Sequence, residues 1–330
     1  MRKALIIGID KYPDFPLQGC ENDAISVSGI LQRNGDGSPN FDIMTLTSDI
    51  GEVTTALIHQ HLEKLFSGEA ETALLYFAGH GIIDPVMNSG FIVSQNGTKP
   101  SWGISLSDLL GLANKAAPKI NSTVIILDSC NSGFAGEVAG LNNGNQNSLI
   151  GAGVTILTAC HRDQEAAELN GQGFFTSMLI DGLSGSAADI LGRITPASVY
   201  SHIDQTLGSW EQRPIYKANV QTFVTLRTVA PKISPEILRM LPTYFKNPTD
   251  TFPLDPSFEP DRQNIPEEFR NIPVNEENTK VFKHLQLCNR YGLVIPVDAE
   301  HMYYAAIHST GCKLTALGAH YRRLAEIGRI

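Results

Sequence analysis

The chain alternates short apolar, β-branched runs with stretches in which apolar residues recur at helical spacing. This alternation is typical of an α/β fold with a mostly parallel sheet and helices on both faces, because parallel strands are buried on both sides. We predict six strands, at residues 4–9, 43–47, 73–78, 123–127, 154–159 and 223–226. Helical periodicity predicts helices at about residues 21–33, 52–66, 105–115, 174–183 and 195–208.

The composition changes where this pattern ends, near residue 230. Nine of the 18 prolines fall within residues 231–273. Proline removes a backbone donor and fixes φ, so neither a helix nor an inner strand persists at that density. We therefore expect three parts: an α/β domain over residues 1–230, an extended connector over 231–274 that aromatic side chains such as Phe245 attach to a surface, and a small module over 275–330.

The small module has its own pattern of elements. Residues 279–290 predict a helix, residues 302–307 and 312–315 a hairpin, and residues 316–326 a final helix. This order resembles a winged helix, and residues 311–318 resemble the wing strand that enters the last helix. Residues 275–330 carry seven Lys and Arg against five acidic residues. So weak a positive charge leaves DNA binding open but favours a protein-interaction or sensing role.

Charge is divided unevenly along the chain. Residues 1–230 hold 13 Lys and Arg against 22 Asp and Glu, whereas residues 231–330 hold 12 of each, so the net charge of −9 belongs to the first part. That balance argues against non-specific nucleic-acid binding as the main activity, because phosphate contacts need clustered cations. Attraction of a cationic substrate and simple solubility both remain open as its explanation.

The cysteines and the apolar runs bear on location. Five cysteines are scattered along the chain without metal-ligand spacing, which indicates a reducing compartment. No apolar run approaches the roughly 18 residues of a membrane span, and the apolar run at residues 4–9 is too short for a signal peptide. We expect a cytoplasmic protein without a membrane partner.

Two predicted strands end in segments that carry reactive side chains. His80 lies between two glycines after the strand at residues 73–78, and Cys130 lies in Asp-Ser-Cys-Asn-Ser-Gly after the strand at 123–127. Sites in parallel sheets form at the carboxyl ends of strands. A thiolate nucleophile with a nearby imidazole base is the minimum for cysteine-peptidase chemistry. Alone, either residue is more often structural; together, with flanking glycines, they favour a catalytic pair.

These motifs stand among several others in a familiar order. Residues 3–228 resemble the caspase-like cysteine peptidases of clan CD, in the branch of metacaspases and prokaryotic caspase homologues. The matching segments are residues 3–9, 17–24, 79–81, 128–133, 157–160, 173–176 and 212–214. The family usually has a histidine directly after the cysteine, whereas Asn131 stands here. The resemblance implies a caspase-like fold and a peptide or protein substrate.

The resemblance also implies roles for individual residues. His80 and Cys130 would form the catalytic dyad, and the backbone N–H groups of Gly81 and Cys130 would hold the oxyanion. Asp23 and Asp128 would form a pocket for Arg or Lys, since two converging carboxylates favour a cation. A helix-start position is the alternative explanation of Asp23.

A metal site is not expected. Metacaspases commonly bind calcium after the histidine, but Asp84 is the only acidic residue between Gly81 and Leu106, too few for six to eight oxygen ligands. His59 and His61 stand two apart on a predicted helix and so cannot share a helical face. We therefore predict no metal, no calcium requirement and no cofactor.

The distribution of basic residues bears on regulation. Between Asn131 and His161 there is no Lys or Arg, so an enzyme specific for basic residues cannot activate itself by cutting there. We expect activation by a protein partner or signal through residues 275–330, as in a bacterial defence or cell-death effector, while self-cleavage of the connector stays open. The alternative function is a catalytically silent adaptor or DNA-binding regulator that uses the caspase-like domain for protein interaction.

Overall fold

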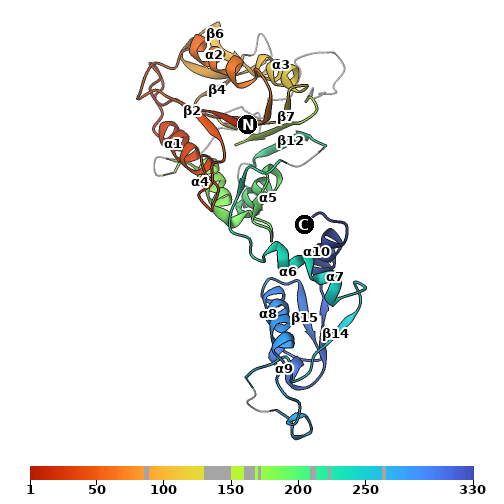
Figure 1. Ribbon diagram of the computed structural model, residues 1–330. Helices are drawn as coiled ribbons and strands as arrows, with labels where there is room; N and C mark the ends of the chain where they lie inside the picture. Colours follow the sequence, from red (N-terminus) through yellow and green to blue (C-terminus); the bar gives the residue numbers. More distant parts are fainter. Residues whose placement is uncertain are drawn as a thin grey trace, which may run out of the picture. The chain divides into compact units, whose positions relative to one another are not determined.

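The computed structural model describes residues 1–84, 89–129, 150–159, 168–169, 172–208, 213–221, 224–261 and 265–330. These residues belong to two units. The first comprises Met1–Ala188 and Gly192–Ala230, and the second comprises Asp189–Leu191 and Pro231–Ile330. Figure 1 shows a sheet with helices in the first unit and a smaller mixed α and β arrangement in the second.

The first unit is built on a six-stranded sheet. Its strands, in sheet order, are β12 (Ile215–Asn219), β8 (Val154–Thr158), β7 (Ile120–Asp128), β3 (Ala70–Ala78), β1 (Arg2–Gly8) and β2 (Asp42–Thr47). All neighbouring pairs are parallel except β12 and β8. The mostly parallel six-stranded sheet is therefore confirmed, and β3 lies near its centre between β1 and β7.

Helices cover both faces of this sheet, as the periodicity predicts. The five helices are α1 (Cys20–Leu31), α2 (Thr55–Leu65), α3 (Leu106–Ala116), α4 (Phe174–Asp181) and α5 (Pro196–Thr206). Alternate residues of a strand point to opposite faces. Leu5 of β1 packs in one core with α2 and α3, and Ile6 packs in the other with α1, α4 and α5. Burial on both faces explains why the inner strands read as continuous apolar runs.

The sixth strand differs from the prediction. It is β12, whereas Val224–Leu226, the described part of the predicted run, forms no strand. Leu226 is fully buried and donates its backbone N–H to Ile194. The strand β12 lies at the sheet edge and is half exposed, so polar residues such as Lys217 are tolerated and the apolar signal is weak.

Further short strands were not predicted. The largest set is an antiparallel three-stranded sheet of β4 (Gly81–Asp84), β5 (Ser89–Thr98) and β6 (Ser101–Ser105). Two ribbons pair β9 (Glu168–Leu169) with β10 (Gln172–Gly173), and β11 (Arg193–Ile194) with β13 (Arg227–Thr228). A π-helical turn, Gly182–Ser186, follows α4. Strand β4 begins at Gly81, directly after His80, so its pairing with β5 fixes the backbone on the carboxyl side of His80.

The second unit has its own core. Its elements are α6 (Pro235–Arg239), α7 (Leu241–Tyr244), β14 (Thr251–Pro253), a 3-10 turn (Glu267–Phe269), α8 (Glu276–Arg290), β15 (Val294–Val297), α9 (Met302–Ile307), β16 (Gly311–Leu314) and α10 (Ala316–Glu326). Phe245 and Leu254, from the proline-rich segment, are buried in one cluster with Phe282 and Leu285 of α8. Short elements between prolines, rather than a single extended chain, fill the segment at residues 231–274.

The predicted hairpin of the second unit is wrong. Residues 302–307 form α9, and the described strands pair in the order β14–β16–β15. Met302, Ala305 and Ala306 are buried, and their spacing of three and four residues is that of one helix face. Nearly every residue of this run is apolar, so the sequence does not show this spacing. The resulting order is helix, strand, helix, strand, helix, and the winged-helix likeness stays a prediction that this topology does not support.

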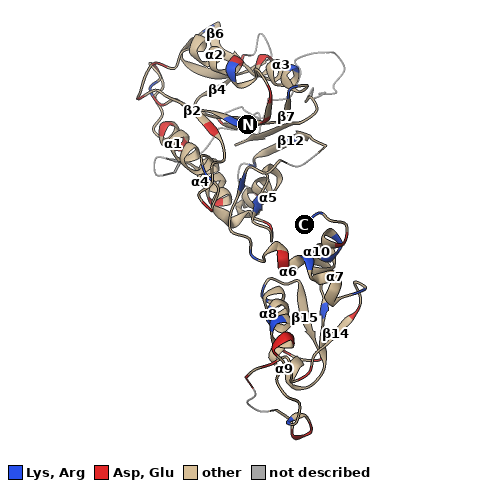
Figure 2. Ribbon diagram, viewed as in Figure 1, with Lys and Arg blue, Asp and Glu red and all other residues tan. Residues whose placement is uncertain are grey.

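Charges of both signs occur together in the second unit. Figure 2 shows acidic and basic residues along α8. Lys280 pairs there with Glu277, and Arg322 of α10 pairs with Glu326. Arg322 is 4% exposed and also donates to the Phe245 carbonyl, so this cation is part of the packing rather than of a free basic face.

Alanine substitutions at two glycines of the first unit should change the stability of the protein in opposite directions. A Cβ on Gly8 would lie 2.2 Å from the Cys20 carbonyl oxygen, whereas a Cβ on Gly29 of α1 would meet nothing within 4 Å. Gly8→Ala should lower the free energy of unfolding by about 1–3 kcal/mol through overpacking. Gly29→Ala should raise it by about 0.5–1 kcal/mol, since alanine is the better helix former. Urea unfolding midpoints measure both, and shifts of the same sign would contradict this.

Two thiols of the second unit should resist alkylation. Cys288 and Cys312 are 1% and 0% exposed, and burial raises the pKa of each to about 12. Because the thiolate is the nucleophile, iodoacetamide at pH 8 should leave both unmodified in the folded protein and should label both in guanidinium. Peptide mass spectrometry distinguishes the sites. Labelling of either thiol in the folded protein at the rate seen in denaturant would refute their burial.

Candidate functional site

The carboxyl end of β3 places His80 beside the end of β7. Ala78 pairs with Asp128, and the Gly79 N–H donates to the Asp128 carbonyl at 3.3 Å. A Cβ on Gly79 would lie 2.5 Å from the Tyr12 hydroxyl, so glycine is required where the chain turns out of the sheet. His80 therefore leaves the sheet at a fixed position.

The His80 imidazole is held through one of its two nitrogens. Nε2 lies 2.6 Å from the backbone carbonyl oxygen of Phe15, in the loop that follows β1. A carbonyl only accepts, so Nε2–H is the donor and Nδ1 of the neutral ring keeps its lone pair. In this tautomer Nδ1 is the ring nitrogen that can accept a proton.

Tyr12 fixes both the ring and the backbone of His80. Its hydroxyl accepts the His80 backbone N–H at 3.0 Å and donates to the Val93 carbonyl at 3.1 Å. The two ring centroids are 4.5 Å apart. Burial raises the pKa of the Tyr12 phenol, which therefore stays a neutral donor.

The loop that carries Tyr12 and Phe15 is tied at both ends. The Asp10 carboxylate accepts the backbone N–H groups of Cys20 and Glu21 at 2.9 and 3.2 Å, and so caps α1 from outside the helix. Gly19, at the N-cap, supplies no side-chain cap. The backbone N–H of Asp10 itself donates to the Ser48 hydroxyl at 3.0 Å.

Asp23 and Asp128 lie close together, while their role as a substrate pocket stays a prediction. A Cβ on Gly173, in β10, would lie 2.9 Å from Oδ2 of Asp23 and 2.4 Å from Oδ2 of Asp128, so both carboxylates border one position. The Gly173 N–H donates to Asp23 at 2.9 Å, and the Thr176 hydroxyl donates to Asp128 at 2.7 Å. Asp23 does lie in the first turn of α1, which fits the helix-start alternative, but it is not the N-cap, and the Asp10 carboxylate caps the helix.

Both carboxylates are buried close enough to Tyr76 for their charges to act on it. Asp23 is 2% and Asp128 7% exposed. Burial raises the pKa of Tyr76 well above its ordinary value, and the negative charges of Asp128 and Asp23 add to this. The Tyr76 hydroxyl lies 2.5 Å from the Thr176 oxygen, so a chain of hydrogen bonds leads from β3 through α4 to Asp128.

The remaining candidate residues are Gly81 and Cys130. Gly81 begins β4 and pairs with Ile92. Cys130 lies outside the described residues, which end at Ser129 on this segment. The register brings Asp128, two residues before Cys130, beside Ala78, two residues before His80.

A comparison with protein families supplies the identity of this arrangement. The model of the caspase domain, Peptidase_C14, matches residues 1–224. The chain belongs to the caspase-domain family. Proteins with this domain are cysteine peptidases, which act on protein substrates.

Solved structures resemble the caspase domain at low identity. A crystal structure of a Geobacter sulfurreducens protein aligns with 69% of this chain and 97% of its own, at 15% identity and a TM-score of 0.49. Caspase-1 from Spodoptera frugiperda aligns over 69% of this chain and 90% of its own, at 11% identity and a TM-score of 0.48. Among curated proteins, none matches the chain.

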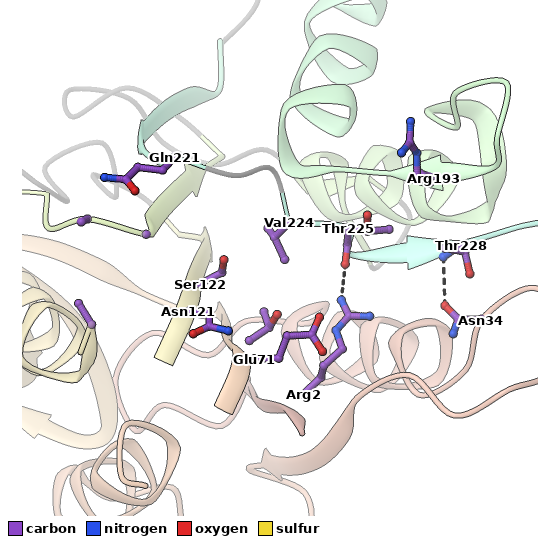
Figure 3. Close-up of a pocket in the computed structure, with 14 residues that line it drawn as sticks. Arg2, Asn34, Glu71, Asn121, Ser122, Arg193, Gln221, Val224, Thr225 and Thr228 are labelled. Carbon is purple, nitrogen blue, oxygen red and sulfur yellow. Dashed lines mark hydrogen bonds between the residues drawn. The ribbon is translucent and has the colours of Figure 1, made fainter. Parts of the chain in front are cut away.

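Two cavities lie at opposite ends of the caspase-domain sheet. One, of about 470 Å³, has His80 in its wall. The other, of about 660 Å³, is shown in Figure 3 and is lined by Arg2 at the start of β1, Glu71 near the start of β3 and Asn121 near the start of β7. The candidate residues lie at the carboxyl ends of the strands, so the first cavity lies at the candidate site and the larger one lies away from it.

Membrane and metal features were also sought in the described part of the chain. There, no helix combines the length and apolarity that crossing a bilayer requires, and no three His, Cys, Asp or Glu side chains gather as a metal site. His59 lies 3.5 Å from Glu63, whereas Nδ1 of His61 lies 2.9 Å from the Leu57 carbonyl oxygen. The absence of a calcium requirement and of a cofactor stays a prediction.

Sequence reasoning missed four contributors to the site. Tyr12 and Phe15 were not singled out, and Phe15 acts through its carbonyl, which any residue supplies. Gly173 and Thr176 lie in residues 173–176, one of the segments on which the family resemblance is based. The sequence therefore marked this segment, but it did not show that these residues donate hydrogen bonds to Asp23 and Asp128.

The Tyr12 hydroxyl should be needed for stability. Tyr12→Phe leaves the His80 N–H without its acceptor, which should cost about 1–3 kcal/mol of unfolding free energy. The control is Tyr200→Phe. Tyr200 packs against Tyr216 with ring centroids 5.5 Å apart, and its substitution should change the unfolding free energy little. Urea unfolding compares the three proteins. An unchanged midpoint for Tyr12→Phe would show that this contact contributes nothing.

Proposed function

We propose that the protein is a cysteine endopeptidase that cleaves after Arg or Lys, with Cys130 as nucleophile and His80 as acid and base. The observation that supports this most directly is the His80 imidazole. Its Nε2–H is bound by the Phe15 carbonyl, which leaves Nδ1 to exchange a proton, and His80 follows the strand that pairs with the one leading to Cys130. Membership of the caspase-domain family supplies the reaction class.

In the proposed acylation Nδ1 of His80 first takes the proton of the Cys130 thiol, and the resulting thiolate attacks the carbonyl carbon of the scissile bond. A carbon–sulfur bond forms, and the carbonyl electron pair moves to oxygen. The oxyanion collapses as the carbon–nitrogen bond breaks, and His80 gives its Nδ1 proton to the leaving amine. A thioester on Cys130 and a free amine are the products of this half-reaction.

In deacylation the same groups act in reverse order. Nδ1 of His80 takes a proton from water, the hydroxide oxygen attacks the thioester, and the thiolate leaves. Backbone N–H groups of Gly81 and Cys130 would hold the oxyanion in both steps. Each such donor typically contributes about 3 kcal/mol to the transition state.

The preference for a basic residue rests on Asp23 and Asp128. The two carboxylates border one position at Gly173 and both act on Tyr76. Two like charges in a buried place favour a cationic partner and oppose the side chain of aspartate or glutamate. The guanidinium group of arginine matches a pair of carboxylates geometrically as well as in charge.

Regulation belongs to the same proposal. Without Lys or Arg between Asn131 and His161, cleavage of that segment by the enzyme itself is not available. We assign activation to a protein partner or signal that acts on the second unit, in a cytoplasmic defence or cell-death response. That the second unit has a separate hydrophobic core supports a separate role for it.

A peptide panel tests the reaction and its specificity together. Peptides with Arg or Lys before the scissile bond should be cleaved and matched Asp peptides should not, with and without cell extract as a source of the activator. Cys130→Ala should abolish cleavage. Turnover of the Asp peptides alone, or cleavage that survives Cys130→Ala, would refute the proposal.

Charge-neutral variants test the carboxylates. Asp128→Asn should lower kcat/KM for Arg peptides at least thirtyfold, as expected for losing one partner of a buried charge pair worth about 2–5 kcal/mol. Asp181→Asn, which alters an exposed carboxylate of the nearby α4, is the matched control. Thermal melting should show both variants folded. Equal activity of Asp128→Asn and wild type would remove Asp128 from the pocket.

A further inference from the structure

We propose that the cavity beside His80 binds the side chain of the substrate residue that follows the scissile bond, and that it selects a large apolar side chain there. This inference rests on the proposed peptidase function. It concerns the leaving side of the substrate, which the Asp23 and Asp128 argument does not address.

The cavity has an apolar wall built from three separate elements. Tyr12 and Phe15 come from the loop after β1, Ile82 from β4 and Trp102 from β6, around a volume of about 470 Å³. Phe15 is 75% exposed, so its ring is accessible to a ligand in the cavity. The arrangement offers an aromatic and aliphatic surface directly beside the imidazole.

The wall is fixed in place rather than free to collapse. Tyr12 is bound to the Val93 carbonyl, and the Trp102 indole N–H points to the Asp84 carboxylate at 3.4 Å. A Cβ on Gly103 would lie 2.3 Å from the Ile92 carbonyl oxygen, so β5 and β6 approach closely next to Trp102. A cavity held open in this way meets its ligand with little reorganisation.

The proton transfer from His80 indicates which part of the substrate lies in the cavity. His80 protonates the leaving nitrogen, so that nitrogen must lie next to the imidazole. The side chain of the leaving residue starts only two bonds from the same nitrogen. A cavity with His80 in its wall is therefore within reach of this side chain.

This cavity lies on one face of the sheet, and the position bordered by Asp23 and Asp128 lies on the other. Tyr12 and Val93 belong to the core that contains α2 and α3, whereas Tyr76 belongs to the core that contains α1 and α4. Asp23 lies on α1, and both carboxylates act on Tyr76. The residue before the scissile bond and the residue after it thus meet opposite faces.

The rim of the cavity carries little net charge. Asp14 and Lys99 oppose each other in sign, and Gln95 and Asn96 are neutral. The rim gives no reason to prefer a charged side chain, so burial of apolar surface decides. Full burial of a leucine or phenylalanine side chain corresponds to an advantage of about ten- to hundredfold over glycine.

Quenched peptides with a constant Arg and a varied following residue test this. In the wild type, kcat/KM for Phe or Leu should exceed that for Gly about ten- to hundredfold. Trp102→Ala and Ile82→Ala should reduce this ratio at least fivefold, while the ratio of Arg to Asp peptides should not move. Ile50→Ala, which removes an 82% exposed apolar side chain from another loop, is the control. Equal rates for Phe and Gly peptides would overturn the subsite and leave the peptidase proposal standing.

A binding measurement decides the matter without turnover. The chain has two tryptophans, so Trp210→Phe combined with Cys130→Ala leaves Trp102 as the sole indole in an inactive full-length protein. Phe-Ala-Gly-amide should quench or shift the Trp102 emission at concentrations where Gly-Ala-Gly-amide does not. The absence of this difference overturns the inference. If the wild type cleaves no peptide with or without cell extract, yet Trp102 discriminates the two amides, the peptidase proposal fails, the substrate-subsite assignment fails with it, and the cavity stands only as a binding site for an apolar side chain.

Discussion

The parallel pairing of β3 with β7 is the constraint on which the site depends. Both strands are buried on both faces, so neither can slip by one residue without moving its apolar side chains to the wrong core. The register sets Ala78 beside Asp128, and each chain leaves the sheet directly afterwards. The position of His80 relative to Asp128 and Ser129, the last described residues before Cys130, follows from strand pairing.

A second dependence runs through the loop after β1. The Asp10 carboxylate caps α1, and the Asp10 backbone N–H donates to the Ser48 hydroxyl, so the loop is fixed at the sheet and at the helix together. Between those attachments the loop presents the Tyr12 hydroxyl and the Phe15 carbonyl to His80. The same capping bond frees Asp23 from a capping role, which lets it face Asp128 across Gly173. One carboxylate thus supports both sides of the proposed chemistry.

Apolar periodicity predicted the parts of the fold that burial on two faces dictates. The inner strands and the five helices of the first unit agree with it, because a continuous apolar run or a helical stripe is what those environments demand. The strand β12 was missed because an edge strand tolerates Lys217, and α9 was misread because its run of apolar residues is too short to show a period. His80 and the two aspartates were found through motifs, whereas the Phe15 contact is made by a backbone carbonyl and has no residue signature.

The division of the caspase domain by its sheet shapes how a substrate would be recognised. On the α1 and α4 face, the two buried carboxylates would act through charge, which reaches several ångströms and discriminates by sign. On the α2 and α3 face, the proposed apolar wall would act through burial, which requires contact and discriminates by size. The imidazole stands where both meet, because it leaves the central strand that contributes Tyr76 to one core and Phe77 to the other. Specificity on each side of the scissile bond would then vary separately, because the two clusters of buried residues have no member in common, although the partly buried Leu17 packs against both.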